Sequence, residues 1–141
     1  MPLSGRDATR FEGAERAWQQ ALGQAGVGIW DLDGVELHDC FTMSELIQYE
    51  SMGITEAGHG ATAIHEGWTT REGRLPVNVS GGLKAKGHPV GATGVSMHVH
   101  AAMQLAGTAG AIQLDDVELF GVFNMGGASV ANYATVLEAV R

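Results

Sequence analysis

One uncharged segment constrains the fold of this chain more than any other feature. From Gly87 to Leu114 there is no Asp, Glu, Lys or Arg, although these residues make up 17% of the sequence. Residues 91–107, "GATGVSMHVHAAMQLAG", have the length and composition of a helix that stops at Gly107. A helix without a charged face is normally buried on every side, and one sheet covers only one side. We therefore expect another copy or another domain to supply a second layer. The alternative is a sufficient polar face made by four side chains, Ser96, His98, His100 and Gln104.

Length and composition indicate one globular domain without a nucleic-acid partner. The chain has 141 residues, of which 45% are hydrophobic, and this excludes a disordered protein. Its formal net charge of −8 disfavours binding to nucleic acids and to anionic membranes, because both call for a basic face. The N-terminus "MPLSGRDATR" lacks the apolar core of a signal peptide, and no apolar run is long enough to span a bilayer. A cytoplasmic location is expected.

The order of the predicted elements is that of a layered α/β domain. Apolar residues at steps of three and four predict a helix over 10–25. A second helix is predicted over 42–52, with Thr42 as N-cap and Glu45 as its capping-box partner. The remaining predictions are strands over 35–38, 75–79, 117–123 and 128–137, a long loop over 53–75, the uncharged helix, and a connection at 124–127 between the last two strands.

A histidine lies in a glycine-rich turn immediately before the uncharged helix. The stretch "GGLKAKGHPVGATG", residues 81–94, surrounds His88 with glycines. Backbone N–H groups converge at the start of a helix, and the helix dipole favours negative charge there. In that place a neutral imidazole can donate a hydrogen bond to a developing oxyanion or accept the proton of a nearby thiol. The alternative for His88 is a structural turn residue.

Three blocks of sequence resemble the C-terminal half of thiolases. They are "HDCF" at 38–41, "NVSGGLKAKGHPVGATG" at 78–94 and "NMGG" at 124–127, and the resemblance covers nearly the whole chain. It is greatest to thiolases of the sterol-carrier-protein type and to bacterial thiolase-like lipid-transfer proteins. The resemblance implies one half of the thiolase fold, a mixed sheet with helices on both faces and a buried central helix at about 91–107. It also implies that residues 1–141 are one C-terminal domain and that the nucleophile-bearing N-terminal domain is absent.

The resemblance also implies roles for individual residues. His88 matches the histidine that activates the nucleophilic cysteine and helps to hold the enolate oxygen. His38 falls where many thiolases have an asparagine that holds a water against the same oxygen. Cys40 corresponds to the acid/base that moves the α-proton in the sterol-carrier type, although free cysteine is also common as a small buried hydrophobe. Asn124 replaces the second reactive cysteine of most thiolases, and it is expected beside Gly126, whose N–H contributes to the second oxyanion hole.

Four further residues are weaker candidates for substrate binding. Lys84 and Lys86 could meet the phosphates of coenzyme A, or they could be solvated loop residues. Trp68 and Met125 could line an acyl pocket, or they could belong to the core. No metal site is expected, because no histidine has a carboxylate or cysteine partner at ligand spacing.

The missing nucleophile limits the function that the sequence predicts. Cys40 is the only cysteine, so no residue is left to form an acyl-enzyme, and we expect the chain to be inactive alone. The resemblance implies the C-terminal half of an acyltransferase acting on 3-ketoacyl-CoA. It needs no cofactor besides the coenzyme A thioester substrate, and a thiolase N-terminal half in trans or further copies of the chain would be its partner. One alternative is a retro-aldolase that cleaves steroid side-chain CoA thioesters with a small OB-fold partner. Another is a non-catalytic partner-binding module.

Overall fold

A three-stranded mixed sheet forms the centre of the protein, which we describe over residues 7–140 from a computed structural model. Its strands lie in the order β1 (Gly34–Leu37), β2 (Leu119–Gly126) and β3 (Ala131–Glu138). β1 runs parallel to β2, and β2 runs antiparallel to β3. A parallel pair requires a long crossover, and here the chain from residue 38 to 118 supplies it. The sheet and its helices confirm the predicted mixed α/β class.

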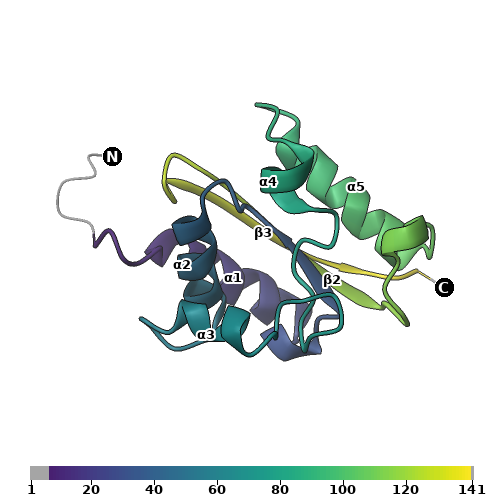
Figure 1. The fold of residues 1–141 in the computed structure, drawn as a ribbon, viewed down its shortest axis with the longest axis horizontal. Helices are drawn as coiled ribbons and strands as arrows, with labels where there is room; N and C mark the ends of the chain where they lie inside the picture. The colour runs from purple at the N-terminus through teal and green to yellow at the C-terminus, as the bar shows by residue number, and fades with distance from the viewer. Residues whose placement is uncertain (1–6, 141) are drawn as a thin grey trace.

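Helices cover both faces of this sheet (Figure 1). On one face lie α1 (Glu12–Ala25), α2 (Thr42–Met52) and α3 (Gly60–His65). On the other lie α4 (Gly82–Lys86) and α5 (Thr93–Leu105). The described residues also form two short 3-10 helices, at Ile29–Asp31 and Gly110–Ile112. No helix within residues 7–140 has both the length and the hydropathy to cross a membrane.

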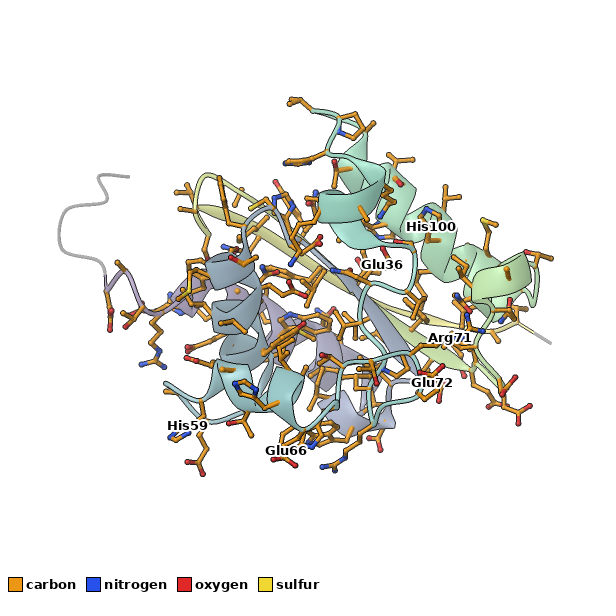
Figure 2. The ribbon with its side chains drawn as sticks, viewed as in Figure 1. Glu36, His59, Glu66, Arg71, Glu72 and His100 are labelled. Atoms are coloured by element: carbon orange, nitrogen blue, oxygen red, sulfur yellow. The ribbon has the colours of Figure 1, made fainter. Side chains whose placement is uncertain are left out.

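The central strand β2 separates two hydrophobic cores. Successive side chains of a strand point to opposite faces, so Phe120 and Val122 pack with α5 while Phe123 and Met125 pack with α1 and α2. The same alternation on β1 sends Glu36 to the α4 side of the sheet (Figure 2). These two cores set the positions of the residues that follow the strands.

The helix α5 is buried along one face and open along the other. Met97, Ala101 and Gln104 face the sheet and are buried. On the opposite side the side chains of Val95 and Val99 are 68% and 51% exposed. The sheet of this chain therefore covers one side of the uncharged helix, which is what a single sheet can do. The open side is apolar, and it is the side for which a second layer is expected.

Two predictions about helices need correction. The second helix spans 42–52 as predicted, but Phe41 is its N-cap and no side chain caps it, because Thr42 already has helical geometry. Glu45 instead accepts a hydrogen bond from Tyr49 at 2.7 Å and forms an ion pair with Lys84. The predicted loop over 53–75 contains the short helix α3. Its six residues are too few to show a helical repeat of apolar residues in the sequence.

Predictions about the shorter strands also need correction. Residues 75–79 make only one bridge, between Val77 and Val35, because Asn78 adopts a φ of 53° and turns the chain away from β1. The last two strands are joined by residues 127–130, so Asn124 lies within β2 and not in the turn. The pairing of Asn124 with Tyr133 in the antiparallel ladder explains this extension.

Candidate functional site

A cavity of about 1150 Å³ lies at the edge of the sheet where β1 and β2 end. Because these strands are parallel, their carboxyl ends meet at one edge. The cavity is lined by residues from four separate segments. They are the chain just before α1, the chain from the end of β1 into α2, the loop before α5 with the first part of that helix, and the β2–β3 hairpin. Six of the predicted site residues line it together: His38, Cys40, His88, Asn124, Met125 and Gly126.

His38 is held neutral with its proton on Nδ1. Its Nδ1 lies 2.6 Å from Oδ1 of Asn124, and an amide oxygen can only accept, so the imidazole donates through Nδ1. Gly94, at the start of α5, has no Cβ and therefore leaves room for Nδ2 of Asn124. Burial lowers the pKa of His38 below its usual value, and the neighbouring His88 acts in the same direction, against the hydrogen bond that His38 donates to Asn124 and the charge of Asp39. Nε2 of His38 is therefore an acceptor.

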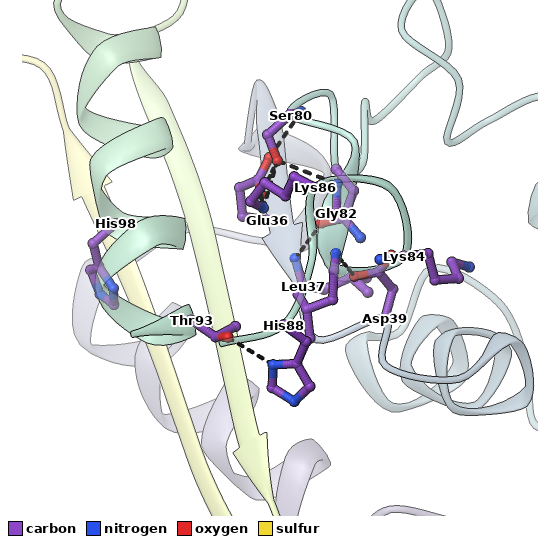
Figure 3. A network of polar contacts seen from close by, with 12 residues as sticks. Glu36, Leu37, Asp39, Ser80, Gly82, Lys84, Lys86, His88, Thr93 and His98 are labelled. Carbon is purple, nitrogen blue, oxygen red and sulfur yellow. Dashed lines mark hydrogen bonds and ion pairs between the residues drawn. The ribbon is translucent and has the colours of Figure 1, made fainter. Parts of the chain in front are cut away.

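His88 stands edge-on to His38. The two ring centroids are 4.8 Å apart and the ring planes meet at 86°. Nδ1 of His88 lies 2.7 Å from the hydroxyl of Thr93 on α5. Figure 3 marks this contact with a dashed line. The Thr93 hydroxyl donates its single proton to the carbonyl of Pro89 at 3.2 Å, so it accepts the proton of His88 Nδ1. In a neutral imidazole bonded in this way, Nε2 of His88 carries no proton and can accept one.

Cys40 completes the group of reactive side chains around the cavity. It is half-buried, and it packs against both hydrophobic cores while lining the cavity. It lies three residues beyond the end of β1 and two residues after His38. Cys40 and the two imidazoles therefore border one cavity.

The other three predicted residues lie elsewhere. Lys84 forms an ion pair with Glu45, and Lys86 lies 3.3 Å from Glu36, so both ammonium groups are paired and neither lines the cavity. Trp68 packs edge-on against Trp30 with ring centroids 6.0 Å apart. It lines a separate cavity of about 430 Å³ together with residues around α3. The structure does not bring these three side chains to Cys40 and His88.

Sequence reasoning missed several residues that shape the site. Gln48, buried on α2, donates to the carbonyl of His38 at 2.7 Å and to that of Ser44 at 3.0 Å. His98 on α5 lines the cavity and links Gly94 to Thr135 through its two ring nitrogens, at 2.7 and 3.2 Å. A polar pair at positions 44 and 48 of an otherwise buried helix face was the available signal for Gln48. Nothing in the local sequence pointed to the contact of His98 with β3.

Metal ligands do not gather in the part of the chain that the structure describes. No group of three or more His, Cys, Asp or Glu side chains there is arranged to hold a metal ion. The cavity offers one thiol and three imidazoles, but no carboxylate lines it.

Comparisons with known proteins agree on one family. A family model described as "Thiolase C-terminal domain-like" matches residues 3–139. An acetyl-CoA acetyltransferase of Methanothermobacter thermautotrophicus is 41% identical over 122 residues, which are 86% of this chain and 32% of that protein. Sterol carrier protein 2 of Homo sapiens is 38% identical over 116 residues, which are 82% of this chain and 21% of that protein.

A solved structure has the same fold. The structure titled "Ltp2-ChsH2(DUF35) aldolase" superposes with a TM-score of 0.86 and 26% sequence identity, over 96% of this chain and 34% of that chain. The present chain therefore spans about a third or less of the length of each of these relatives.

Proposed function

Because this chain belongs to the thiolase C-terminal domain-like family, we propose that it supplies the acid/base half of an acyl-CoA acyltransferase site for 3-ketoacyl-CoA substrates. The observation that carries the proposal is the pair of imidazoles at the cavity that Cys40 also lines, with both Nδ1 atoms engaged in hydrogen bonds. In the neutral rings this leaves both Nε2 atoms as acceptors. A base with a free ring nitrogen is what activation of a thiol nucleophile requires.

In this proposal each of the three side chains has a separate task. His88 accepts the proton of the nucleophilic thiol at Nε2, and the imidazolium that results donates to the thioester oxygen as negative charge develops there. His38 holds a water molecule through Nε2 against the same oxygen. Cys40 exchanges the α-proton of the substrate, and Gly126 offers its backbone N–H to a second oxyanion.

The nucleophile itself comes from outside the residues of this chain. Cys40 is the only cysteine in the sequence, and its place beside His38 suits the α-proton. We propose that a thiolase N-terminal half, on a partner chain or elsewhere in a longer protein, brings the acyl-accepting thiol to the cavity. Apolar side chains at the rim are suited to such docking, since Val90 is 98% and Phe41 74% exposed.

Reconstitution tests this proposal. The chain is assayed with a 3-ketoacyl-CoA and free coenzyme A, alone and together with a thiolase N-terminal half that carries its cysteine. We expect turnover only for the pair, and a loss of about 10²–10⁴-fold for Cys40→Ala, the range for one acid/base group. Met43→Ala is the matched control, because Met43 is exposed, close in sequence and outside the cavity lining. Turnover by the chain alone, or full activity of Cys40→Ala in the pair, would contradict the proposal.

A second candidate is retro-aldol cleavage of steroid side-chain CoA thioesters, in a complex with a small OB-fold protein. The observation that favours it is the fold match to a protein whose title names an aldolase. The two reactions differ in their need for coenzyme A, since thiolysis consumes it as a second substrate and retro-aldol cleavage does not. A 3-hydroxyacyl-CoA that is cleaved without added coenzyme A would identify the aldolase. A stable pair that turns over neither substrate would indicate a non-catalytic partner-binding module.

A further inference from the structure

Two buried carboxylates beside the site have no task in the proposed chemistry. The side chains of Glu36 and Asp39 belong to residues that are only 1% and 2% exposed. A buried carboxylate is costly unless hydrogen bonds or a cation compensate for the loss of water. Both carboxylates face the segment over 78–86, which leads directly to His88 (Figure 3).

Glu36 and Leu37 hold the two ends of the segment over 78–86 against β1. Glu36 accepts hydrogen bonds from the Ser80 hydroxyl at 2.6 Å and from the Lys86 ammonium at 3.3 Å. The backbone N–H of Leu37 donates to the side chain of Asn78 at 2.8 Å. These contacts bind the start and the end of the segment to the strand that carries His38.

Asp39 holds the middle of the segment by its backbone. Its Oδ1 accepts from the N–H of Leu83 at 2.7 Å, and its Oδ2 accepts a longer bond from Lys84 at 3.4 Å. Both N–H groups belong to the first turn of α4, where no helical partner exists for them. Gly82 makes this approach possible, since a Cβ at that position would collide with the carboxylate and its φ is 60°.

The position of His88 depends on where α4 ends. The helix stops at Gly87, whose φ is 101°, one residue before His88, and Gly91 with a φ of 81° follows shortly after. The backbone is permissive at these two glycines, so the anchors on either side of them decide where the ring lies. One anchor is Thr93 on α5, and the other is the contact of Asp39 with α4.

We propose that Asp39 is a positioning residue: it fixes α4 to the strand end that carries His38 and Cys40, and so it sets the His88 ring against the His38 ring. This inference rests on the proposed function, because the imidazole pair matters only in that chemistry. Its test uses proton titration and not turnover. An inactive reconstituted pair would therefore count against the function alone, and unchanged coupling of the histidines would count against the positioning role alone.

The experiment is a double-mutant cycle in which the pKa of His38 is measured by NMR titration of its imidazole ring in the full chain. The groups whose charges act on this ring are His88 and Asp39, so each variant is compared with and without His88→Gln. In the wild type, we expect His88→Gln to raise the pKa of His38, because the coulombic effect of the His88 ring, which lowers that pKa, is removed. In the Asp39→Asn background we expect no such rise, because the His88 ring no longer lies against His38.

Asp33 provides the matched control. Its carboxylate accepts two backbone N–H bonds, from residues 118 and 119 at 2.8 and 2.9 Å, at the opposite end of β1. Asp33→Asn therefore removes the same kind of bond, and we expect it to leave the rise intact. Gly82→Ala, which displaces α4 from Asp39 without changing charge, replaces Asp39→Asn if that variant does not fold. Persistence of the full rise in either folded variant would overturn the inference.

Discussion

At the scale of single residues, the state of both imidazoles is decided by oxygens that accept a proton. Oδ1 of the Asn124 amide can only accept a hydrogen bond. The Thr93 hydroxyl accepts from His88 because it donates its own proton to the carbonyl of Pro89. The histidines are therefore in the same tautomer for two different reasons. Such an arrangement is sensitive to changes in the acceptors, which gives two predictions.

The first concerns Asn124→Asp. A carboxylate in place of the amide oxygen that lies 2.6 Å from His38 Nδ1 stabilises the imidazolium, so we expect the pKa of His38 to rise. NMR titration of the ring measures this change. Asn132→Asp is the control, because Asn132 lies in the same hairpin and its side chain bonds to Ser129. A pKa for His38 that stays the same or falls in Asn124→Asp would contradict the assigned tautomer.

The second concerns the pH dependence of stability. The pKa of His38 is lowered in the folded state, chiefly by burial, from an ordinary value of 6.5. As the pH falls through 6.5 toward the lower folded value, only the unfolded chain takes up this proton. We therefore expect the free energy of unfolding to decrease in that window, and to be fully restored above it.

Urea unfolding at a series of pH values measures this decrease. Below pH 6.5, His38→Gln should reduce the slope of the unfolding free energy against pH, since the titrating group is gone. His59→Gln is the control, because His59 is exposed and lies at the periphery near α3 (Figure 2). An unchanged slope in His38→Gln would show that other groups carry the dependence.

At the scale of elements, the close approach of α1 to the sheet depends on one glycine. Gly121 lies on β2 opposite Trp18, and a Cβ there would come within 2.9 Å of both the Trp18 ring and Leu32. Trp18 in turn stacks on Phe123 with ring centroids 6.0 Å apart. The aromatic pair therefore occupies the space that a side chain at position 121 would need.

Gly121→Ala and Gly23→Ala should consequently have opposite effects. The first forces Trp18 or its neighbours to move, and we expect a loss of about 1–3 kcal/mol in the free energy of unfolding. The second adds a methyl group in open space on α1, and we expect a gain of about 0.5–1 kcal/mol. Chemical denaturation of the two variants measures both. Equal effects of the two substitutions would contradict the packing described for β2.

At the scale of the whole molecule, the uncharged helix has an apolar surface that residues 7–140 do not cover. Val95 and Val99 lie one turn apart on the open side of α5, and Val95 also borders the cavity. Assembly on this side would therefore cover the helix and close the site at the same time. This is the surface on which we expect the nucleophile-bearing half to dock.

Val95→Asp tests this surface. Because Val95 is exposed in the chain alone, we expect the unfolding free energy to change by only about 0.5 kcal/mol or less. Association with the thiolase N-terminal half should weaken strongly, since a charge would be buried without a partner. Sedimentation of the mixture measures it, with Val140→Asp as a fully exposed control outside α5. Equal association of both variants would place the docking surface elsewhere.

The elements that could be predicted from the sequence are those with a long, regular pattern. The helix over 10–25 repeats its apolar residues over several turns, and the uncharged segment over 91–107 has the length and composition of a helix. The observed spans, Glu12–Ala25 and Thr93–Leu105, agree closely with these predictions. The bridge at Val77 and the five-residue helix α4 were not predicted correctly, because each depends on contacts with β1 or Asp39. For segments this short, tertiary contacts outweigh local preference.

By itself the sequence determined the family, the α/β order of elements, the candidate histidines and cysteine, and the lack of a second thiol. Each of these depends on residue identity or on spacing within a few turns. Only the tertiary structure decided which proton each imidazole keeps, that Lys84 and Lys86 are paired with carboxylates, and that Trp68 lies away from the cavity. The physical reason is distance along the chain: the bond from His38 to Asn124 joins residues 86 positions apart, and that from Lys86 to Glu36 joins residues 50 apart. No local pattern records such pairs, because only folding brings them together.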